Sequence, residues 1–207
     1  MGGRLISDIA ILKQMIKKSA TVPLLEQQNG KRLSYAIALT ETQSKPENSY
    51  SVTINGMPKH DEVIVIKADA FPAPRKIFQG KKGECKRADF VIIANTNTEK
   101  FILCIEMKKK KGSNKAIIQQ LTGAKCFVSY CQEIGKAFWH KHNFLDAYQY
   151  RFVSIGHISI SKKRTRPYSR KKQKSGDRSN GIHDCPEQML KISSQNSLEF
   201  NYLLQGN

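Results

Sequence analysis

Acidic residues are scarce in this 207-residue chain, which has 17 Asp and Glu against 35 Lys and Arg. The formal net charge is therefore +18, and the sequence pI is about 9.8. Such an excess of positive charge predicts a polyanionic partner, and nucleic acid is favoured over a membrane surface. The alternative is a basic protein whose charge serves no particular partner, but the clustering of the charge along the chain argues against it.

Segments that would direct the chain into or across a membrane are also missing. The sequence has no signal peptide and no run of about 18 apolar residues. The five cysteines are odd in number and include no CxxC pair, so a disulfide framework is not expected. These absences predict a soluble, cytoplasmic protein with reduced thiols and no membrane partner.

Several familiar catalytic signatures do not occur. There is no glycine-rich phosphate loop, kinase signature or Ser/His/Asp set. His140 and His142 are two residues apart, whereas two ligands on one helix face are separated by three or four. His183 and Cys185 lack a second pair of ligands. The chemistry of the chain is therefore expected to reside in other residues.

Two apolar segments that carry ionic residues occupy the middle of the chain. Asp89 directly precedes the apolar run 90–94, and the apolar run 102–105 leads into Glu106-Met107-Lys108. Ionic groups are costly on strands that read as buried, unless they are paired or bind a metal. The polar stretch 95–100 between the two runs predicts a hairpin connection.

The spacing of this hairpin predicts that its carboxylates meet. If the hairpin is symmetric about residues 97–98, Asp89 lies directly opposite Glu106, with Cβ atoms roughly 4.5–5.5 Å apart. Side chains alternate along a strand, so Glu106 and Lys108 share one face. Two carboxylates this close repel each other unless a cation lies between them. A register slip of one residue would place them on opposite faces.

This pattern resembles the PD-(D/E)xK nuclease superfamily, which has the restriction-endonuclease-like fold. Asp89 matches the first acidic position of the family motif, and Glu106-Met107-Lys108 matches its second part, while Ala88 stands where the family has Pro. The order of elements over residues 4–160 fits as well. A second Glu-x-Lys match at 84–86 lies in a polar turn without a preceding apolar strand, and it is not assigned to the motif.

The resemblance implies a Mg²⁺-dependent endonuclease, in which Mn²⁺ is expected to replace Mg²⁺. Its catalytic residues would be Asp89, Glu106 and Lys108, and its metal ligands Asp89, Glu106 and the backbone carbonyl of Met107. Lys108 would orient or help deprotonate the attacking water. Gln119 or Gln120, in the helix that follows, is a candidate for an additional site residue. DNA is favoured over RNA as the substrate, and a homodimer is expected by resemblance.

Three alternatives stand beside this interpretation. The chain could be a non-catalytic nucleic-acid-binding protein on the same fold, or a nuclease subunit that is active only in a larger complex. The carboxylates and the lysine could also form a cross-strand ion network on a solvated face, with no metal.

The remaining pattern predicts a single domain over residues 1–207 of the α/β class, built as an α+β mixed sheet. The restriction-endonuclease-like core order is helix, strands, helix, strand. Helices are predicted over 5–16, 113–134 and 137–147, and strands over 34–40, 50–54, 62–67, 89–94, 102–108, 150–160, 188–192 and 198–204. Ser7 or Asp8 and Ser113 are the predicted N-caps.

A basic segment at 162–184 reads as a flexible loop or arm inserted within the domain. Together with the lysine run after the motif, it supplies the predicted contacts to nucleic acid: Lys109, Lys110, Lys111, Lys162, Lys163, Arg164, Arg166, Arg170, Lys171, Lys172 and Lys174. Such contacts would hold the phosphate backbone without reading its sequence.

Removing charge from the basic segment is expected to weaken nucleic-acid binding about equally for all sequences. Each lost phosphate contact on duplex DNA should also flatten the log–log salt dependence by roughly 0.9. The residues to neutralise are Arg166, Arg170, Lys171, Lys172, Lys174 and Arg178. A binding titration over a range of salt concentrations measures both quantities. Unchanged affinity and slope would instead identify the segment as a localisation or protein-docking signal.

Overall fold

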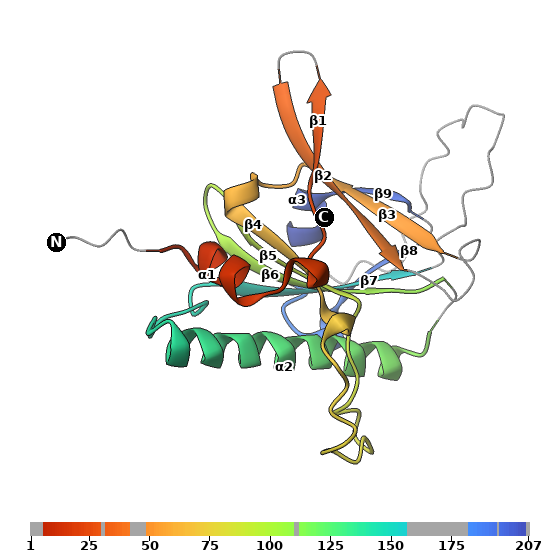
Figure 1. Cartoon of the computed structure of the whole chain (residues 1–207). Coiled ribbons are helices and arrows are strands. Elements are labelled where there is room, and N and C mark those ends of the chain that lie inside the picture. The colour runs from red at the N-terminus through yellow and green to blue at the C-terminus, as the bar shows by residue number, and fades with distance from the viewer. Residues whose placement is uncertain are drawn as a thin grey trace.

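Two β-sheets and a layer of helices are stacked in the computed structural model, which describes residues 6–29, 32–41, 49–109, 112–156, 182–193 and 195–205 (Figure 1). The strands are β1 (Leu25–Asn29), β2 (Arg32–Glu41), β3 (Tyr50–Asn55), β4 (Val63–Lys67), β5 (Phe90–Asn95), β6 (Lys100–Met107), β7 (Gln149–Gly156), β8 (Leu190–Ser193) and β9 (Ser197–Glu199). The helices are α1 (Asp8–Met15), α2 (Asn114–Phe138) and α3 (Phe200–Gln205), with the short 3-10 helices η1 (Lys18–Ala20), η3 (His60–Glu62), η4 (Ala68–Ala70) and η5 (Pro186–Gln188).

Both sheets are mixed, so the fold is of the α+β type. The five-stranded sheet has the order β4-β5-β6-β7-β8, in which β4, β5 and β6 are antiparallel and β6, β7 and β8 are parallel. The four-stranded sheet has the order β1-β2-β3-β9, and its last pair is parallel. Helix α2 connects the parallel neighbours β6 and β7, because parallel strands need a long crossover connection.

The five-stranded sheet is buried on both faces, which is why β4, β5 and β6 read as nearly continuous apolar runs. Alternate residues of β5 divide between the two faces. Phe90 and Ile92 pack against the four-stranded sheet. Val91 and Ile93 pack against α1 and α2. The central strands therefore sit between two separate apolar cores.

Helix α2 lies along one face of the five-stranded sheet (Figure 1). Its N-cap is Ser113, whose hydroxyl accepts a hydrogen bond from the N–H of Ala116 at 3.2 Å, as predicted. Ile117, Leu121 and Val128 form its buried stripe. The first helix is confirmed in the same way, because the Ser7 hydroxyl accepts from the N–H of Ala10 at 3.2 Å.

Two predicted elements differ in the structure. The helix predicted over 137–147 is wrong: α2 ends at Phe138, and the chain turns back through His140 and Leu145, both in left-handed conformations. The reversal seats the buried ring of Phe144 against Gly135 of α2. The strand predicted over 198–204 continues beyond β9 only as the helix α3.

Strand β1 has no counterpart among the predicted elements, because its residues Glu26, Gln27 and Gln28 are polar. The strand is a half of the β1–β2 hairpin, which extends beyond the layered core (Figure 1). Leu25 and Leu33 in this hairpin are about half exposed. The alternation of apolar and polar residues that usually predicts a strand is therefore weak in this hairpin.

None of the helices in the described part of the chain has both the length and the hydropathy of a membrane span. The basic segment at 162–184 lies outside the described residues except for its last three positions, and residues 157–160 of the predicted strand 150–160 lie outside them as well.

The contact of Gly135 with Phe144 predicts an unusual cost for a glycine-to-alanine change in a helix. A Cβ at position 135 would lie 2.1 Å from the Phe144 ring. Gly135→Ala should therefore lower the free energy of unfolding by about 1–3 kcal/mol, although alanine favours helix formation. In the Phe144→Ala background the same change should cost little, and a double-mutant cycle by chemical denaturation measures the difference. Equal costs in both backgrounds would contradict the contact.

Candidate active site

The pairing of β5 with β6 brings the predicted carboxylates together. Phe90 pairs with Ile105 and Val91 pairs with Cys104. One step beyond Phe90, the same register places Asp89 opposite Glu106, so the predicted register is confirmed. The backbone N–H of Met107 donates a hydrogen bond to Asp89 Oδ2 at 2.6 Å, which holds the Asp89 side chain against the end of β6.

Both carboxylates are buried. Asp89 is 8% exposed and Glu106 is fully buried, on the face of the sheet where Val91 and Cys104 pack toward α2. A structural ion network on a solvated face would leave them open to water. Their burial is the arrangement that is costly without a compensating positive charge.

Lys108 supplies one positive charge to the pair. Its ammonium group forms an ion pair with Glu106 Oε1, and its side chain is 31% exposed. Among the described residues, Glu106 Oε1 contacts only the Lys108 ammonium, and Glu106 Oε2 has no hydrogen-bond partner. A buried carboxylate that keeps an oxygen without a donor is suited to accept a further cation.

The ionisation of the two carboxylates is linked. Burial raises the pKa of Asp89 above its ordinary range, and the nearby charges of Glu106 and Glu41 raise it further. Burial likewise raises the pKa of Glu106, although the ammonium of Lys108 opposes the change. Both shifts have the sign expected of like charges forced together in a poorly solvated place.

The pKa of Lys108 is raised as well, but for a lysine this shift favours the charged form. Burial alone would lower the pKa of Lys108, but the Glu106 carboxylate, with Asp89 and Glu41 behind it, outweighs burial and raises the pKa above its ordinary value. Lys108 is therefore an ammonium group in this arrangement. It can donate hydrogen bonds and offset negative charge, but it cannot accept a proton.

Three further residues at this site were missed by sequence reasoning. Glu41 ends β2, Tyr50 begins β3 directly opposite it, and Asp69 lies in η4. The pKa of Glu41 is raised by burial and then by the charge of Asp69, while Lys108 lowers it. Glu41 is thus an outer member of the carboxylate cluster. Its place at the end of an alternating strand was visible in the sequence, but the sheet that it faces was not.

Tyr50 links the two sheets at the site. Its hydroxyl donates to the carbonyl oxygen of Met107 at 3.3 Å and accepts from the backbone N–H of Lys109. Burial raises the pKa of Tyr50, and the charges of Glu41, Asp89 and Glu106 add to the effect, so the phenol stays protonated. Tyr50 therefore holds the backbone on both sides of Lys108.

The donor set suits a hard divalent cation with an incomplete protein shell. In the described part of the chain, no three His, Cys, Asp or Glu side chains converge closely enough to hold a metal ion by themselves. Asp89, Glu106 and the Met107 carbonyl could provide three oxygens. Mg²⁺ is commonly bound by one or two carboxylates, with water and phosphate oxygens completing its octahedral shell. The residues therefore fit a hard divalent cation whose remaining ligands do not come from the protein.

The other predicted site residues lie in different places. Gln119 contacts the loop before β5, because its Nε2 donates to the carbonyl oxygen of Lys82 at 2.9 Å. Gln120 is a partly buried residue of α2, and no described contact joins it to the carboxylates. Lys109 directly follows the site on the chain. Lys110 and Lys111, and the predicted contacts in the basic segment, lie outside the described residues.

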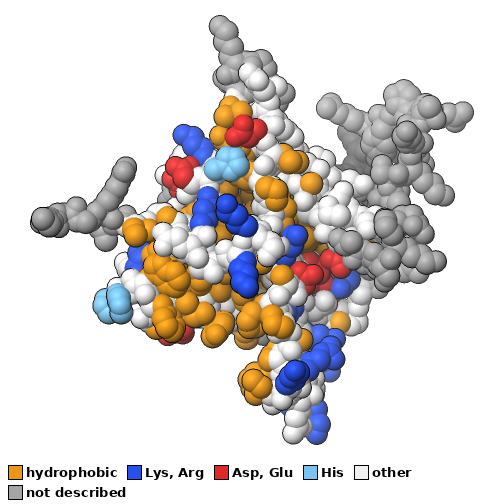
Figure 2. Space-filling model, viewed as in Figure 1, with side chains coloured by type: hydrophobic (Ala, Val, Ile, Leu, Met, Phe, Trp, Pro, Cys, Tyr) orange, Lys and Arg blue, Asp and Glu red, His pale blue; other side chains and the backbone are white. Residues whose placement is uncertain are grey.

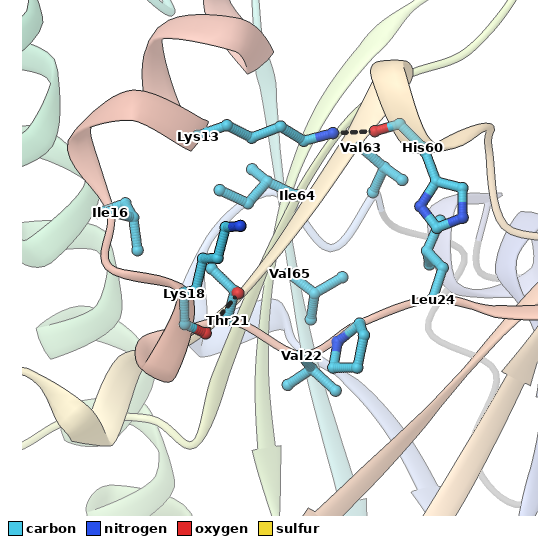
Figure 3. Close-up of a pocket in the computed structure, with 11 residues that line it drawn as sticks. Lys13, Ile16, Lys18, Thr21, Val22, Leu24, His60, Val63, Ile64 and Val65 are labelled. Carbon is cyan, nitrogen blue, oxygen red and sulfur yellow. Dashed lines mark hydrogen bonds between the residues drawn. The ribbon is translucent and has the colours of Figure 1, made fainter.

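A hollow of about 430 Å³ between α1 and β4 is separate from this site (Figure 3). Its lining is mainly apolar, with Val22, Ile64 and Val65 along its floor and Lys13 and His60 at its rim. Lys13 donates to the carbonyl oxygen of His60 across the rim. The hollow contains no carboxylate, so it has no part in the proposed metal chemistry.

Comparison with known proteins adds no relative. No protein-family model matches the chain, and neither the curated proteins nor the solved structures give a significant match. The resemblance to PD-(D/E)xK nucleases therefore depends on the motif residues and their geometry.

The buried carboxylates predict a pH-dependent stability of the metal-free protein. A carboxyl group with a raised pKa in the folded state stabilises the fold fully below its unfolded pKa of about 4, and this stabilisation is lost as the pH rises through the folded pKa. Asp89→Asn removes one charge and retains an acceptor for the Met107 N–H. It should raise the free energy of unfolding by about 1–3 kcal/mol at pH 8 in EDTA, and by much less near pH 4.

Chemical denaturation at the two pH values measures this difference. Glu99→Gln, an exposed change at the far end of the β5–β6 hairpin, is the matched control and should alter stability by less than about 0.5 kcal/mol. A loss of stability for Asp89→Asn at pH 8 would contradict the electrostatic interpretation.

Proposed function

We propose that the protein is a metal-dependent nuclease that hydrolyses phosphodiester bonds in nucleic acid, with DNA favoured over RNA. The observation that carries the proposal is the buried pair Asp89 and Glu106, joined in register on adjacent strands and followed by Lys108 on the same face. The mixed sheet, with α2 crossing between β6 and β7, is compatible with the restriction-endonuclease-like core that the motif implies.

Asp89, Glu106 and the Met107 carbonyl would hold the cation. When bound, Mg²⁺ or Mn²⁺ would activate water and neutralise charge that develops on the phosphate. Tyr50 would hold the Met107 carbonyl in place through its hydrogen bond. With a cation at the carboxylates, Lys108 would be released from its ion pair with Glu106.

The ammonium of Lys108 would then be free to act on the substrate. It could orient the attacking water and donate a hydrogen bond to a phosphate oxygen. Preorganised donors of this kind are most effective where charge builds up in the transition state. The proposed role of this ammonium group is charge stabilisation, because a protonated lysine donates hydrogen bonds and has no lone pair that accepts a proton.

A second candidate is a non-catalytic nucleic-acid-binding protein. One observation favours it: Lys108 already neutralises Glu106 through an ion pair, so the site has one compensating charge without a metal. The formal net charge of +18 supports nucleic acid as the partner under either candidate.

Cleavage assays distinguish the two candidates. The purified chain should cut plasmid, linear duplex, single-stranded DNA or RNA in Mg²⁺ or Mn²⁺ and should be inactive in EDTA. Asp89→Asn, Glu106→Gln and Lys108→Ala should each lower the single-turnover rate by at least about 100-fold, because the first two weaken the hold on the cation and the third removes a donor to the reacting phosphate. Binding should remain close to that of the wild type, and the two carboxylate changes should tend to tighten it.

Glu99→Gln removes a carboxylate from the same hairpin at a distance from the site, and it should cut at the wild-type rate. Cleavage at the wild-type rate by all three site variants would place the active site elsewhere. Binding by the wild-type protein without cleavage in any metal would favour the non-catalytic candidate.

A further inference from the structure

A projecting loop at residues 75–86, termed here the finger loop, combines exposed apolar side chains with positive charge. Ile77 is 81% exposed and Phe78 is 52% exposed, although the removal of both apolar side chains from water would be favourable in free energy. The finger loop contains five basic residues and one acidic residue, which gives it a formal charge of +4: Arg75, Lys76, Lys81, Lys82, Lys86 and Glu84. Figure 2 shows Lys and Arg side chains, in blue, on an extension below the body of the molecule.

The single acidic residue of the finger loop serves its internal structure. The Glu84 carboxylate accepts hydrogen bonds from the backbone N–H groups of Gly80 and Lys82, both at 2.8 Å. The pKa of Glu84 is lowered by backbone hydrogen bonds, the largest effect coming from its own N–H. Gly80 and Gly83 adopt positive φ values of 78° and 98°, which glycine tolerates best. The loop therefore has a defined shape.

Helix α2 anchors the finger loop from the side. Gln119 donates to the carbonyl oxygen of Lys82, and a Cβ on Gly123 would lie 2.0 Å from the carbonyl oxygen of Lys86. The backbones of α2 and the loop are thus in direct contact. Ile77 and Phe78 lie on a turn that is also fixed, since both of their N–H groups donate to the carbonyl oxygen of Pro74. The apolar side chains are held exposed by the structure around them.

Both ends of the finger loop lead to the carboxylate site. The chain enters the loop from η4 and leaves it at Asp89, and the N–H of Ala68 donates to the Asp89 carbonyl oxygen at 2.9 Å across the base of the loop (Figure 1). The Arg87 guanidinium closes the base further through the carbonyl oxygens of Phe71 and Pro72. A polyanion bound at the carboxylate site would therefore pass beside the loop.

We propose that the finger loop binds a nucleic-acid duplex and opens a base step, with Ile77 and Phe78 placed against the unstacked base and the lysines against phosphates. Apolar wedges of this kind unstack base steps, and stacking of a base on an aromatic ring contributes about 1–3 kcal/mol. A hollow of about 270 Å³ lined by Arg75 and Lys86 offers a place for a phosphate group. The inference rests on the nucleic-acid partner of the proposed function, but not on cleavage.

An anionic membrane could also attract a basic loop with an apolar tip. Nucleic acid is favoured because the loop begins and ends at a cluster of carboxylates, which would be repelled by a surface of anionic lipid. A phosphodiester strand meets the cluster one phosphate at a time, so the repulsion is smaller and the lysines of the finger loop can outweigh it. Vesicles containing phosphatidylserine therefore form one arm of the test.

The test measures binding in EDTA, so that no cleavage occurs, on a duplex with a single 2-aminopurine whose fluorescence rises when the base unstacks. Wild-type protein should bind and raise the fluorescence. Ile77→Ala with Phe78→Ala should abolish the rise and weaken binding about 5- to 150-fold. Lys81→Ala with Lys82→Ala should weaken binding and reduce the salt slope by up to about 1.8.

Matched control variants remove similar groups elsewhere. Phe138→Ala removes an aromatic ring that is 76% exposed on α2, and Lys59→Ala with Lys100→Ala removes two exposed charges. These variants should leave the fluorescence rise intact. Thermal unfolding of every variant should match the wild type, because the substituted side chains are exposed.

Glu84→Ala separates loop shape from loop charge. The change makes the finger loop more positive but removes the acceptor that holds Gly80 and Lys82. If charge alone attracts the duplex, binding will tighten and the fluorescence signal will persist. If the shaped loop opens the base step, the signal will fall despite the added charge.

Several outcomes would overturn the inference. They are an unchanged signal after Ile77→Ala with Phe78→Ala, a stronger signal for Glu84→Ala, and finger-loop-dependent binding to vesicles but not to duplex. A protein that cleaves nucleic acid without these dependences would retain the proposed function and lose the finger loop as a binding element. A protein that shows these dependences but cleaves nucleic acid with no metal ion tested would retain the finger loop as a binding element and lose the proposed function.

Discussion

The antiparallel pairing of β5 with β6 is the constraint on which the site depends. Side chains on paired strands meet only in the correct register. A shift of one residue would place one of the two carboxylates on the other face of the sheet, in the other apolar core. The turn between the strands fixes this register, since the N–H of Thr96 donates to the carbonyl oxygen of Glu99 at 2.8 Å, and close packing of each face against its own apolar layer maintains it. Asp89 and Glu106 are therefore brought together by the packing of their neighbours rather than by any attraction between them.

The site is electrostatically unfavourable, and the rest of the fold tolerates it. Two like charges lie near the end of the central strands, with Glu41 close behind them, and Lys108 compensates for only part of this charge. Two extensive apolar cores, one on each side of the five-stranded sheet, stabilise the framework that holds these groups. A region of this kind is typical of ligand-binding sites, where affinity for the ligand is gained at some cost in stability.

The sequence was sufficient to predict the β5–β6 hairpin and helix α2, because the signals for these elements are local. Two apolar runs and the polar connection between them specified the β5–β6 register, and Ser113 marked the start of α2. The contribution of Tyr50 depends on how the second sheet packs over the first, which no local pattern records. The prediction of a helix over 137–147 failed for a related reason. The apolar residues there have the spacing of a helix, but the chain reverses so that Phe144 can fill the space over Gly135. Phe200, Leu203 and Leu204 have helical spacing, and their burial in α3 rather than in a strand follows from where the chain end packs.

The hydrogen bonds of the Tyr50 hydroxyl have a consequence for motion. The phenol belongs to the four-stranded sheet, yet both of its partners are backbone groups at the exit of β6. Opening of the β2–β3 hairpin near Tyr50 would therefore release the backbone on either side of Lys108. Conversely, a ligand that immobilises this backbone would slow the opening of the hairpin, and amide hydrogen exchange in β3 would report on events at a site in the other sheet.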